Sequence, residues 1–243
     1  MARMRAAKQA LRDILKSANW RSHLGEIAQG GMTQVGPLFS FLLLEPLLMH
    51  RAAVALGATC AVLAQKEPER ARNVVRRYMW HLSEESGNIG WGIPEAFGET
   101  LAASSILAKD FHRVLITYVI DLGHSDNYCD NDLLRRSCYW ACGRFAEVRP
   151  ELCLNYRPWL AKGLLDRDIV CRGMAAWALC RLPGDLMDVP LLRDLALGRH
   201  NEPCLLFDGE VVYERAVSAI ARDVLLTHPR CSKTEAPSEC EAL

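Results

Sequence analysis

The strongest constraint on the fold is a pattern that recurs along the chain at a nearly constant interval. Each copy spans ten residues and has an apolar residue first, a small one eighth, a bulky one ninth and a small one tenth. The tenth positions fall at residues 57, 98, 143, 180 and 221, so the steps are 41, 45, 37 and 41 residues. Such a period is typical of repeats built from two helices.

The spacing within each copy predicts a helix, because its apolar residues follow a 3.6-residue rhythm. The copies are Leu48, Ala55, Leu56 and Gly57; Ile89, Ala96, Phe97 and Gly98; Leu134, Ala141, Cys142 and Gly143; Cys171, Ala178, Leu179 and Cys180; and Val212, Ala219, Ile220 and Ala221. The small eighth and tenth residues let a neighbouring helix approach closely. One repeat cannot bury its apolar stripe alone, so we predict an all-α chain in which about five helix pairs stack as an α-solenoid.

Acid and arginine pairs support this prediction. The segment from Asp168 to Leu179, with Arg172 one turn after the acid, resembles the second helix of a HEAT repeat, and Asp132 with Arg135 matches the same pattern. The resemblance implies that these acids and arginines stabilise the stack.

A longer stretch, Glu84 to Glu99, is similar to one in uncharacterised HEAT-repeat proteins of sulfate-reducing bacteria. The similarity extends from about Gly36 to Pro150. The chain is thus identified as a HEAT-like repeat protein of the PBS-lyase type, a resemblance that implies no established activity.

Composition bounds the domain organisation. The 243 residues, half of them hydrophobic, are ample for one core, and the balance of 29 basic and 29 acidic side chains gives no global field that favours nucleic acid or an anionic membrane. We expect a basic helix and loop at 1–32, a HEAT-like solenoid at 33–228 and a disordered tail at 229–243, which lacks periodic apolar residues.

Targeting and cysteine patterns predict a cytoplasmic protein. No secretory signal is present, and the apolar run from Phe39 to Leu44 is too short to span a bilayer. Ten cysteines are spread through the helices without metal or redox spacing. Cys138 and Cys142, one turn apart, are the one pair that we considered for a shared metal ion, and we assign no metal or cofactor.

Several local assignments follow from glycine, proline and charge. Gly25 to Gly36 is predicted as a loop, with Pro37 opening the first repeat helix. Near the end, a loop from Gly198 to Gly209 is predicted to precede a helix from Glu210 to Leu226. The basic helix within residues 1–21 is either a cap with a solvated basic face or a membrane-surface or partner-binding helix.

The second repeat breaks its own pattern at three points. Gly90 stands where other repeats carry arginine, and Gly92 and Pro94 lie inside the expected helix. Each glycine costs about 1 kcal/mol and an interior proline about 3 kcal/mol relative to alanine. Either the glycines allow a close approach and Pro94 restarts the helix, or they expose backbone N–H groups that bind an anion.

Acidic residues concentrate around this break. Glu84, Glu85, Glu95 and Glu99 fall within sixteen residues, with Asn88 and Trp91 between them. Such a cluster indicates a basic partner, a divalent cation with His81 as a further ligand, or a raised proton affinity. The alternative is a solvated acidic edge paired with Arg76, Arg77 or Arg135. Trp91 is a binding hot spot if exposed and an inter-repeat wedge if buried.

A second candidate surface lies on the third repeat. Arg136, Trp140 and Arg144 follow four-residue spacing and therefore line one helix face beside Arg135. Such a stripe binds phosphate or stacks a base. Its alternative role is a salt-bridge ladder to the acids of the adjacent repeat.

No nucleophile with an evident base occurs, and Tyr118, Asp121 and His124 are the only acid and base grouping that we considered. The leading hypothesis is a non-catalytic protein-binding scaffold or assembly factor, and a protein partner is expected rather than nucleic acid or a membrane. The alternative is a small-ligand protein, or an enzyme of the bilin-lyase-like or DNA-glycosylase-like HEAT kind, with a pocket that combines Trp91, Glu95, Trp140 and Arg144. The candidate binding residues are Glu84, Glu85, Asn88, Trp91, Glu95, Glu99, Arg136, Trp140 and Arg144.

Overall fold

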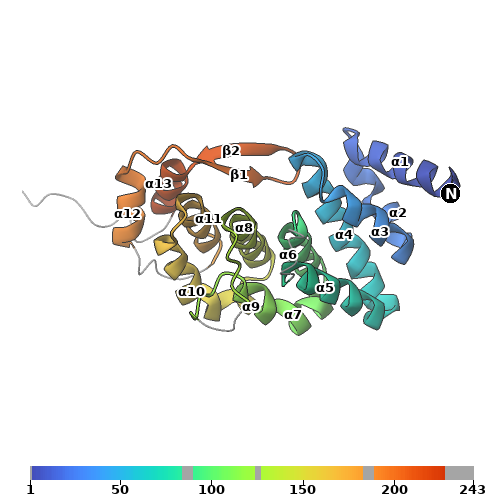
Figure 1. Cartoon of the computed structure of the whole chain (residues 1–243), viewed down its shortest axis with the longest axis horizontal. Helices are drawn as coiled ribbons and strands as arrows, with labels where there is room; N and C mark the ends of the chain where they lie inside the picture. The colour runs from blue at the N-terminus through green and yellow to red at the C-terminus, as the bar shows by residue number, and fades with distance from the viewer. Residues whose placement is uncertain (1, 84–89, 124–126, 183–188, 228–243) are drawn as a thin grey trace, which may run out of the picture.

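Helices make up most of the protein in the computed structural model, which describes residues 2–83, 90–123, 127–182 and 189–227 (Figure 1). The prediction of a mainly helical chain is confirmed. The α-helices are α1 (Ala2–Lys16), α2 (Leu24–Gln29), α3 (Met32–Phe41), α4 (Pro46–Lys66), α5 (Pro68–Leu82), α6 (Ile93–Ala103), α7 (Ser105–Thr117), α8 (Asp132–Val148), α9 (Pro150–Cys153), α10 (Arg157–Lys162), α11 (Ile169–Leu179), α12 (Val189–Leu197) and α13 (Val217–Thr227). Short 3-10 turns are η1 (Trp20–His23), η2 (Leu154–Tyr156) and η3 (Gly163–Leu165).

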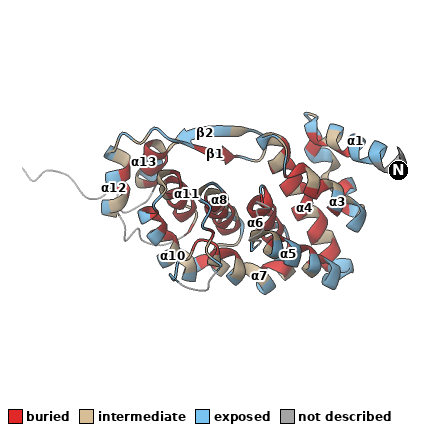
Figure 2. Ribbon diagram, viewed as in Figure 1, coloured by how far each residue is buried: buried red, intermediate tan, exposed pale blue. Residues whose placement is uncertain are grey.

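Five of these helices form a continuous inner row. α4 packs on α6, α6 on α8, α8 on α11 and α11 on α13 (Figure 1). α5, α7, α9 and α10 lie along one side of this row and contact its members. The inner helices carry most of the buried residues (Figure 2).

Glycine at the tenth position of the pattern sets the spacing of the inner row. A β-carbon on Gly57 would lie 2.7 Å from the backbone oxygen of Glu99, and one on Gly98 would lie 2.9 Å from the Cα of Ala141. Real β-carbons essentially never come that close, so a larger residue would push the helices apart. The predicted role of these small residues in close helix approach is confirmed.

The break in the second repeat restarts a helix. Gly92 adopts a left-handed conformation with a φ of 71° immediately before α6, and Pro94 lies in the first turn, where its missing N–H costs little. A β-carbon on Gly92 would lie 2.7 Å from the backbone oxygen of Leu42. Both the close approach and the helix restart that we predicted are therefore present.

Two strands near the C-terminal end contradict the predicted loop and helix there. β1 (Pro203–Phe207) pairs with β2 (Val212–Ala216) as an antiparallel hairpin, with Pro203 opposite Ala216 and Phe207 opposite Val212. Asp208 and Gly209 begin the turn: the Asp208 carboxylate accepts from the N–H groups of Glu210 and Val211, and Gly209 has a φ of 104°. The expected helix therefore begins only at Val217.

The hairpin crosses the inner row from α13 to the N-terminal helices (Figure 1). At its base the Cys204 thiol donates to the backbone of Val170 in α11. At its tip the indole N–H of Trp20 donates to Glu210, and the Arg51 guanidinium donates to the Glu210 backbone. β1 faces the helices, whereas β2 is mostly exposed (Figure 2).

The N-terminal region is more helical than predicted. The expected loop at 25–36 forms most of α2 and the first half of α3, and Pro37 lies inside α3 instead of opening a helix. Gly31, with a φ of 57°, sets the start of α3. Leu11 and Leu15 of α1 are buried, so the apolar face of this basic helix packs on the protein.

One helix, α4, is long and apolar enough to cross a membrane by length and composition alone. In the fold 67% of its apolar window is buried by other parts of the chain. It also packs on α2, α3 and α5.

Candidate functional site

Part of the predicted acidic surface lies outside the described residues. Glu84, Glu85 and Asn88 fall in this part of the chain, as do His124 and the expected tail at 229–243.

The other two candidate carboxylates are buried, each with 5% of the residue exposed. Glu99 forms an ion pair with Arg144, and the Nε of Arg144 lies 2.9 Å from its Oε1. Glu95 lies one turn earlier on α6 and lines a cavity together with Ser137 of α8, whose hydroxyl favours the charged carboxylate. The prediction of a solvated acidic edge is therefore wrong for Glu95 and Glu99.

The arginines of α8 form the salt-bridge ladder that we considered for them. Arg136 donates to both carboxylate oxygens of Asp168, at 2.9 and 2.6 Å. Arg144 joins Glu99 to Glu147. The alternative of a free phosphate-binding stripe is not met, because Trp140 between these arginines is buried.

Trp91 is partly exposed and lies in the turn before α6. Its relative exposure is 38%, whereas Trp80 at the end of α5 is 60% exposed and Leu43 is 65% exposed. Gly92, the neighbour of Trp91, packs on Leu42. We call Leu43, Trp80 and Trp91 the tryptophan surface.

Glu95 and Trp140 line one small cavity, which we call the inner cavity. It has a volume of about 190 Å³ and lies where β1 crosses the inner row. Its walls come from α4, α6, α8, α11 and β1: Met49, His50, Glu95, Leu133, Arg136, Ser137, Trp140, Val170, Met174, Pro203 and Leu205. Leu133 and Leu205 are exposed and mark its rim.

Three buried polar atoms of these wall residues have no hydrogen-bond partner among the described residues. They are Oε2 of Glu95, Nδ1 of His50 and Nε1 of Trp140. All three residues are at least nine-tenths buried. Native proteins leave few buried polar atoms unpaired, and each costs about 1–3 kcal/mol. Three in one small cavity are therefore a strong sign of a missing partner.

Burial shifts the pKa values of two titratable side chains in the cavity wall, Glu95 and His50. Desolvation raises the pKa of the Glu95 carboxyl above its usual 4.5, although the Ser137 hydroxyl acts in the opposite direction. Desolvation lowers the pKa of His50 to about 3, so its imidazole is neutral at physiological pH. The His50 ring packs edge-on to Trp140 and flat on Phe207, with centroids 4.9 and 4.8 Å apart.

The cavity walls do not form a nucleophile relay. A serine nucleophile needs a histidine base at its hydroxyl. Here Ser137 lies beside Glu95 in the cavity wall, and within the described part of the chain no hydrogen bond joins Ser137 to His50. The arrangement serves binding better than acyl transfer.

A second cavity of about 300 Å³ lies beside the hairpin tip and includes Arg144. Arg144, Glu99 and Glu147 form one ion-paired wall. Opposite charges thus meet within the chain itself. Arg181 lies over the Trp177 ring, 3.4 Å from its centroid, and burial lowers the pKa of its guanidinium.

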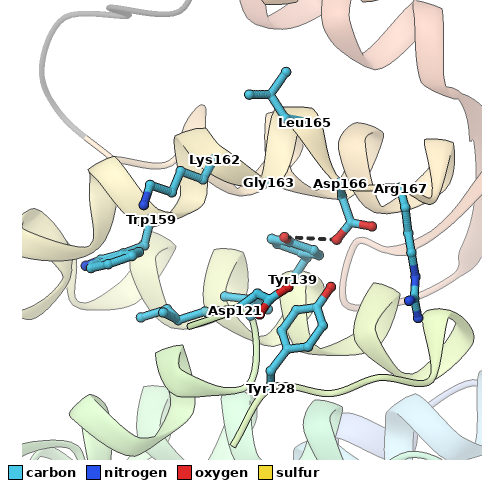
Figure 3. Close-up of a pocket in the computed structure, with 11 residues that line it drawn as sticks. Asp121, Tyr128, Tyr139, Trp159, Lys162, Gly163, Leu165, Asp166 and Arg167 are labelled. Carbon is cyan, nitrogen blue, oxygen red and sulfur yellow. Dashed lines mark hydrogen bonds between the residues drawn. The ribbon is translucent and has the colours of Figure 1, made fainter. Parts of the chain in front are cut away.

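A third hollow, the outer pocket, lies away from the hairpin and has a volume of about 230 Å³. Figure 3 shows Asp166 meeting the Tyr139 hydroxyl there, with Tyr128 and Asp121 on the facing wall and Trp159 and Lys162 at the other end. Tyr139 donates to Asp166 over 3.3 Å. Tyr118, which we had considered with Asp121 for acid–base work, is buried whereas Asp121 is exposed.

Asp166 is fully used by the fold. It accepts from Nε and Nη2 of Arg135 at 2.8 and 2.7 Å and from the backbone N–H of Asp168. Arg135 is completely buried, and its remaining donors reach Asp132 and the backbone of Cys129. Burial disfavours the Arg135 charge, but the hydrogen bonds that its guanidinium donates to Asp166 and Asp132 raise its pKa. The stabilising role implied for Asp132 and Arg135 agrees with these contacts.

Sequence reasoning missed the α4 and hairpin walls of the inner cavity. His50 is one histidine in an apolar helix, and nothing in its neighbours marks it. Leu205 belongs to the hairpin, for which the signal was the Asp208 and Gly209 pair between β-branched and aromatic residues.

Within the described residues, no group of three or more His, Cys, Asp or Glu side chains is placed to hold a metal ion. Cys138 and Cys142 are both buried free thiols. Comparison of the chain with protein families, with curated proteins and with solved structures finds no match in any of the three.

Proposed function

We propose that the protein is a HEAT-like α-solenoid that binds a small organic molecule in the inner cavity. The observation that carries this proposal is that three residues lining one cavity, Glu95, His50 and Trp140, each have a buried polar atom without a partner among the described residues. Small-molecule sites combine mainly apolar walls with a few placed polar groups. The inner cavity has that composition.

The helix order supports the solenoid part of the proposal. Consecutive pattern-bearing helices form the inner row, and the helices between them lie on one side. Tenth-position glycines repeat the same close contact from α4 to α6 and from α6 to α8. A stack of equivalent units produces such a recurrence.

Burial shifts the preference between the two functions considered from the sequence. A scaffold that selects a basic partner needs exposed carboxylates, and Glu95 and Glu99 are covered. Only two of the four residues predicted to share one pocket, Trp91, Glu95, Trp140 and Arg144, line the same cavity. Glu95 and Trp140 line the inner cavity, whereas Arg144 lines its neighbour and Trp91 lines neither.

The test is native mass spectrometry of the full chain purified from its own cells without denaturation. Wild type should retain one small molecule, and Leu205→Trp at the rim should lose it. Val211→Trp is the matched control, because Val211 is exposed in the same hairpin and does not line the cavity. Retention by Leu205→Trp, or no retained mass in wild type, would count against the proposal.

A second candidate function is protein binding through the tryptophan surface. Exposed tryptophans are enriched at binding hot spots, and Trp80, Trp91 and Leu43 are exposed here. The turn that carries Trp91 approaches Leu42 and the backbone of His81, the neighbours of Leu43 and Trp80. This surface keeps Trp91 from the original hypothesis but replaces the carboxylates by Trp80 and Leu43.

Affinity capture with a Trp80→Ala, Trp91→Ala variant tests this second function. A specific protein captured by wild type should be lost, while Leu197→Ala, at an 86% exposed position elsewhere, should retain it. Equal capture by all three proteins would remove the tryptophan surface as the docking site.

A further inference from the structure

The Glu95 carboxyl has no cation to balance it. Among the described residues no lysine, arginine or histidine forms an ion pair with Glu95. The nearest candidate in the cavity wall, Arg136, is already held by both oxygens of Asp168. Ser137 lies beside Glu95 in the cavity wall, and Oε2 of Glu95 has no hydrogen-bond partner among the described residues. Burial disfavours the charge of such a carboxyl, so a positive charge from outside the chain would stabilise its ionised form.

The remaining walls suit an organic cation better than a metal ion. Trp140 and His50 present aromatic rings, and Met49 and Met174 present soft thioether side chains. Aromatic faces attract organic cations. Metal ions such as Ca²⁺ and Mg²⁺ need several oxygen ligands, and this cavity offers one carboxylate.

The size of the cavity and a second unpaired atom, the indole N–H of Trp140, restrict the class of ligand further. A cavity of about 150 Å³ is large enough for benzene. The inner cavity, at about 190 Å³, therefore holds a molecule slightly larger than one aromatic ring. The indole N–H of Trp140 requires a hydrogen-bond acceptor on the same ligand.

We propose that the inner cavity binds a small organic ammonium or amidinium ion that also carries a hydrogen-bond acceptor. The cationic N–H group donates to Oε2 of Glu95, and the acceptor receives the N–H of Trp140. This inference rests on the proposed small-molecule function and specifies its ligand class.

Calorimetric titration of the full chain tests the charge with a matched pair of probes. Benzylamine and benzyl alcohol have nearly the same shape, but only the first is cationic at neutral pH. Because charge-assisted hydrogen bonds are about twice as strong as neutral ones, wild type should bind benzylamine roughly tenfold more tightly. Glu95→Gln keeps the shape and one hydrogen bond, and should lose that preference.

The Trp140 contact is tested with histamine, whose ring nitrogen supplies the acceptor. Trp140→Phe keeps an aromatic wall but removes the donor. This variant should bind histamine several-fold more weakly and benzylamine unchanged. Far-ultraviolet circular dichroism of both variants should match wild type, which separates loss of binding from loss of fold.

The possible results distinguish failure of the proposed ligand class from failure of the proposed binding site. Equal binding of benzylamine and benzyl alcohol, or an unchanged preference in Glu95→Gln, overturns the cation. A neutral or anionic molecule retained in native mass spectrometry also overturns the cation and leaves the cavity standing. If none of the probes binds at concentrations on the order of millimolar and no molecule is retained, both proposals fail.

Discussion

Two buried polar regions of this protein differ in how completely the chain satisfies them. Arg135 and Asp166, beside the outer pocket, are buried and joined by two hydrogen bonds, and the donors that remain reach Asp132 and backbone carbonyls. Glu95, which lines the inner cavity, is also buried, yet one of its oxygens has no partner in the described part of the chain.

The difference separates a structural network from a binding site. A completed network holds helices in place, and its partners come from the fold. A network with unpaired atoms lowers stability, and we expect it to persist where a molecule from outside the chain supplies the missing hydrogen bonds. The charged groups of the outer pocket therefore explain the packing of α8 against η3 and α11, whereas Glu95, His50 and Trp140 call for a ligand.

Breaking the closed network should give the largest effect. Asp166→Leu leaves Arg135 buried without its main counterion, and we expect a loss of about 3–5 kcal/mol in the free energy of unfolding. Urea unfolding followed by circular dichroism measures it. Arg167→Ala, which removes an exposed partner of Asp132, should cost less than about 1 kcal/mol. Similar losses in the two variants would show that burial does not decide the energy.

A partly shared pair should give an intermediate effect. Glu99→Ala removes one partner of Arg144 but leaves Glu147 in place. We expect a loss of about 2 kcal/mol in the same unfolding experiment. A loss as large as that of Asp166→Leu would mean that Glu147 contributes nothing to Arg144.

Removing the open carboxyl should change stability in the opposite direction. Glu95→Leu replaces an unsatisfied buried group by an apolar one, so the ligand-free protein should gain about 1 kcal/mol or stay unchanged. Denaturant unfolding of protein stripped of ligand provides the measurement. A loss of several kcal/mol would place Glu95 among the structural groups.

The pH dependence of this effect has a defined sign. Burial raises the folded-state pKa of Glu95 above 4.5, so the folded protein holds this proton more tightly than the unfolded chain. The contribution of the carboxyl is complete below pH 4.5 and is lost as pH rises through the raised pKa.

The stability of wild type relative to Glu95→Gln should therefore fall as pH rises from 4.5 to neutrality. His50, whose pKa is lowered to about 3, and the ion pair of Arg136 with Asp168 face the same cavity. Both proteins contain them, so their titrations cancel in the difference. A difference that rises with pH would mean that an unseen cation lowers the pKa of Glu95.

The smallest effect belongs to the hairpin tip. Glu210→Gln keeps an acceptor for Trp20 but removes the exposed ion pair with Arg21, and it should cost less than about 1 kcal/mol overall. Amide hydrogen exchange should nonetheless become faster in residues 203–216 than in α8. Uniform protection would indicate that the packing of Phe207 on His50 alone fixes the hairpin.

Local pattern was enough to predict the inner row. The spacing from Leu48 to Gly57 and from Leu134 to Gly143 indicates the helix period. The glycine that ends each copy indicates the close contact between helices, because a larger residue at that position would not fit. The cap at Asp168 was predictable for the same reason, since its side chain accepts from Cys171 three residues on.

The candidate site was only half predictable, because its contacts join distant parts of the chain. Glu95 and Trp140 were chosen from local features, but the burial of Glu95 depends on α8 and β1. The hairpin was missed because Val212 and Ala219 match the helical pattern, while its tip is held by Trp20 and Arg51, far away in sequence. Tertiary contacts of this kind override local propensity.

The most direct measurement is a crystal structure of the full chain purified from its own cells without denaturation. We expect electron density for an organic molecule in the inner cavity, with a nitrogen within hydrogen-bond distance of Oε2 of Glu95 and an acceptor at Nε1 of Trp140. Density for ordered water alone at both atoms would contradict the account, because water would then complete the network.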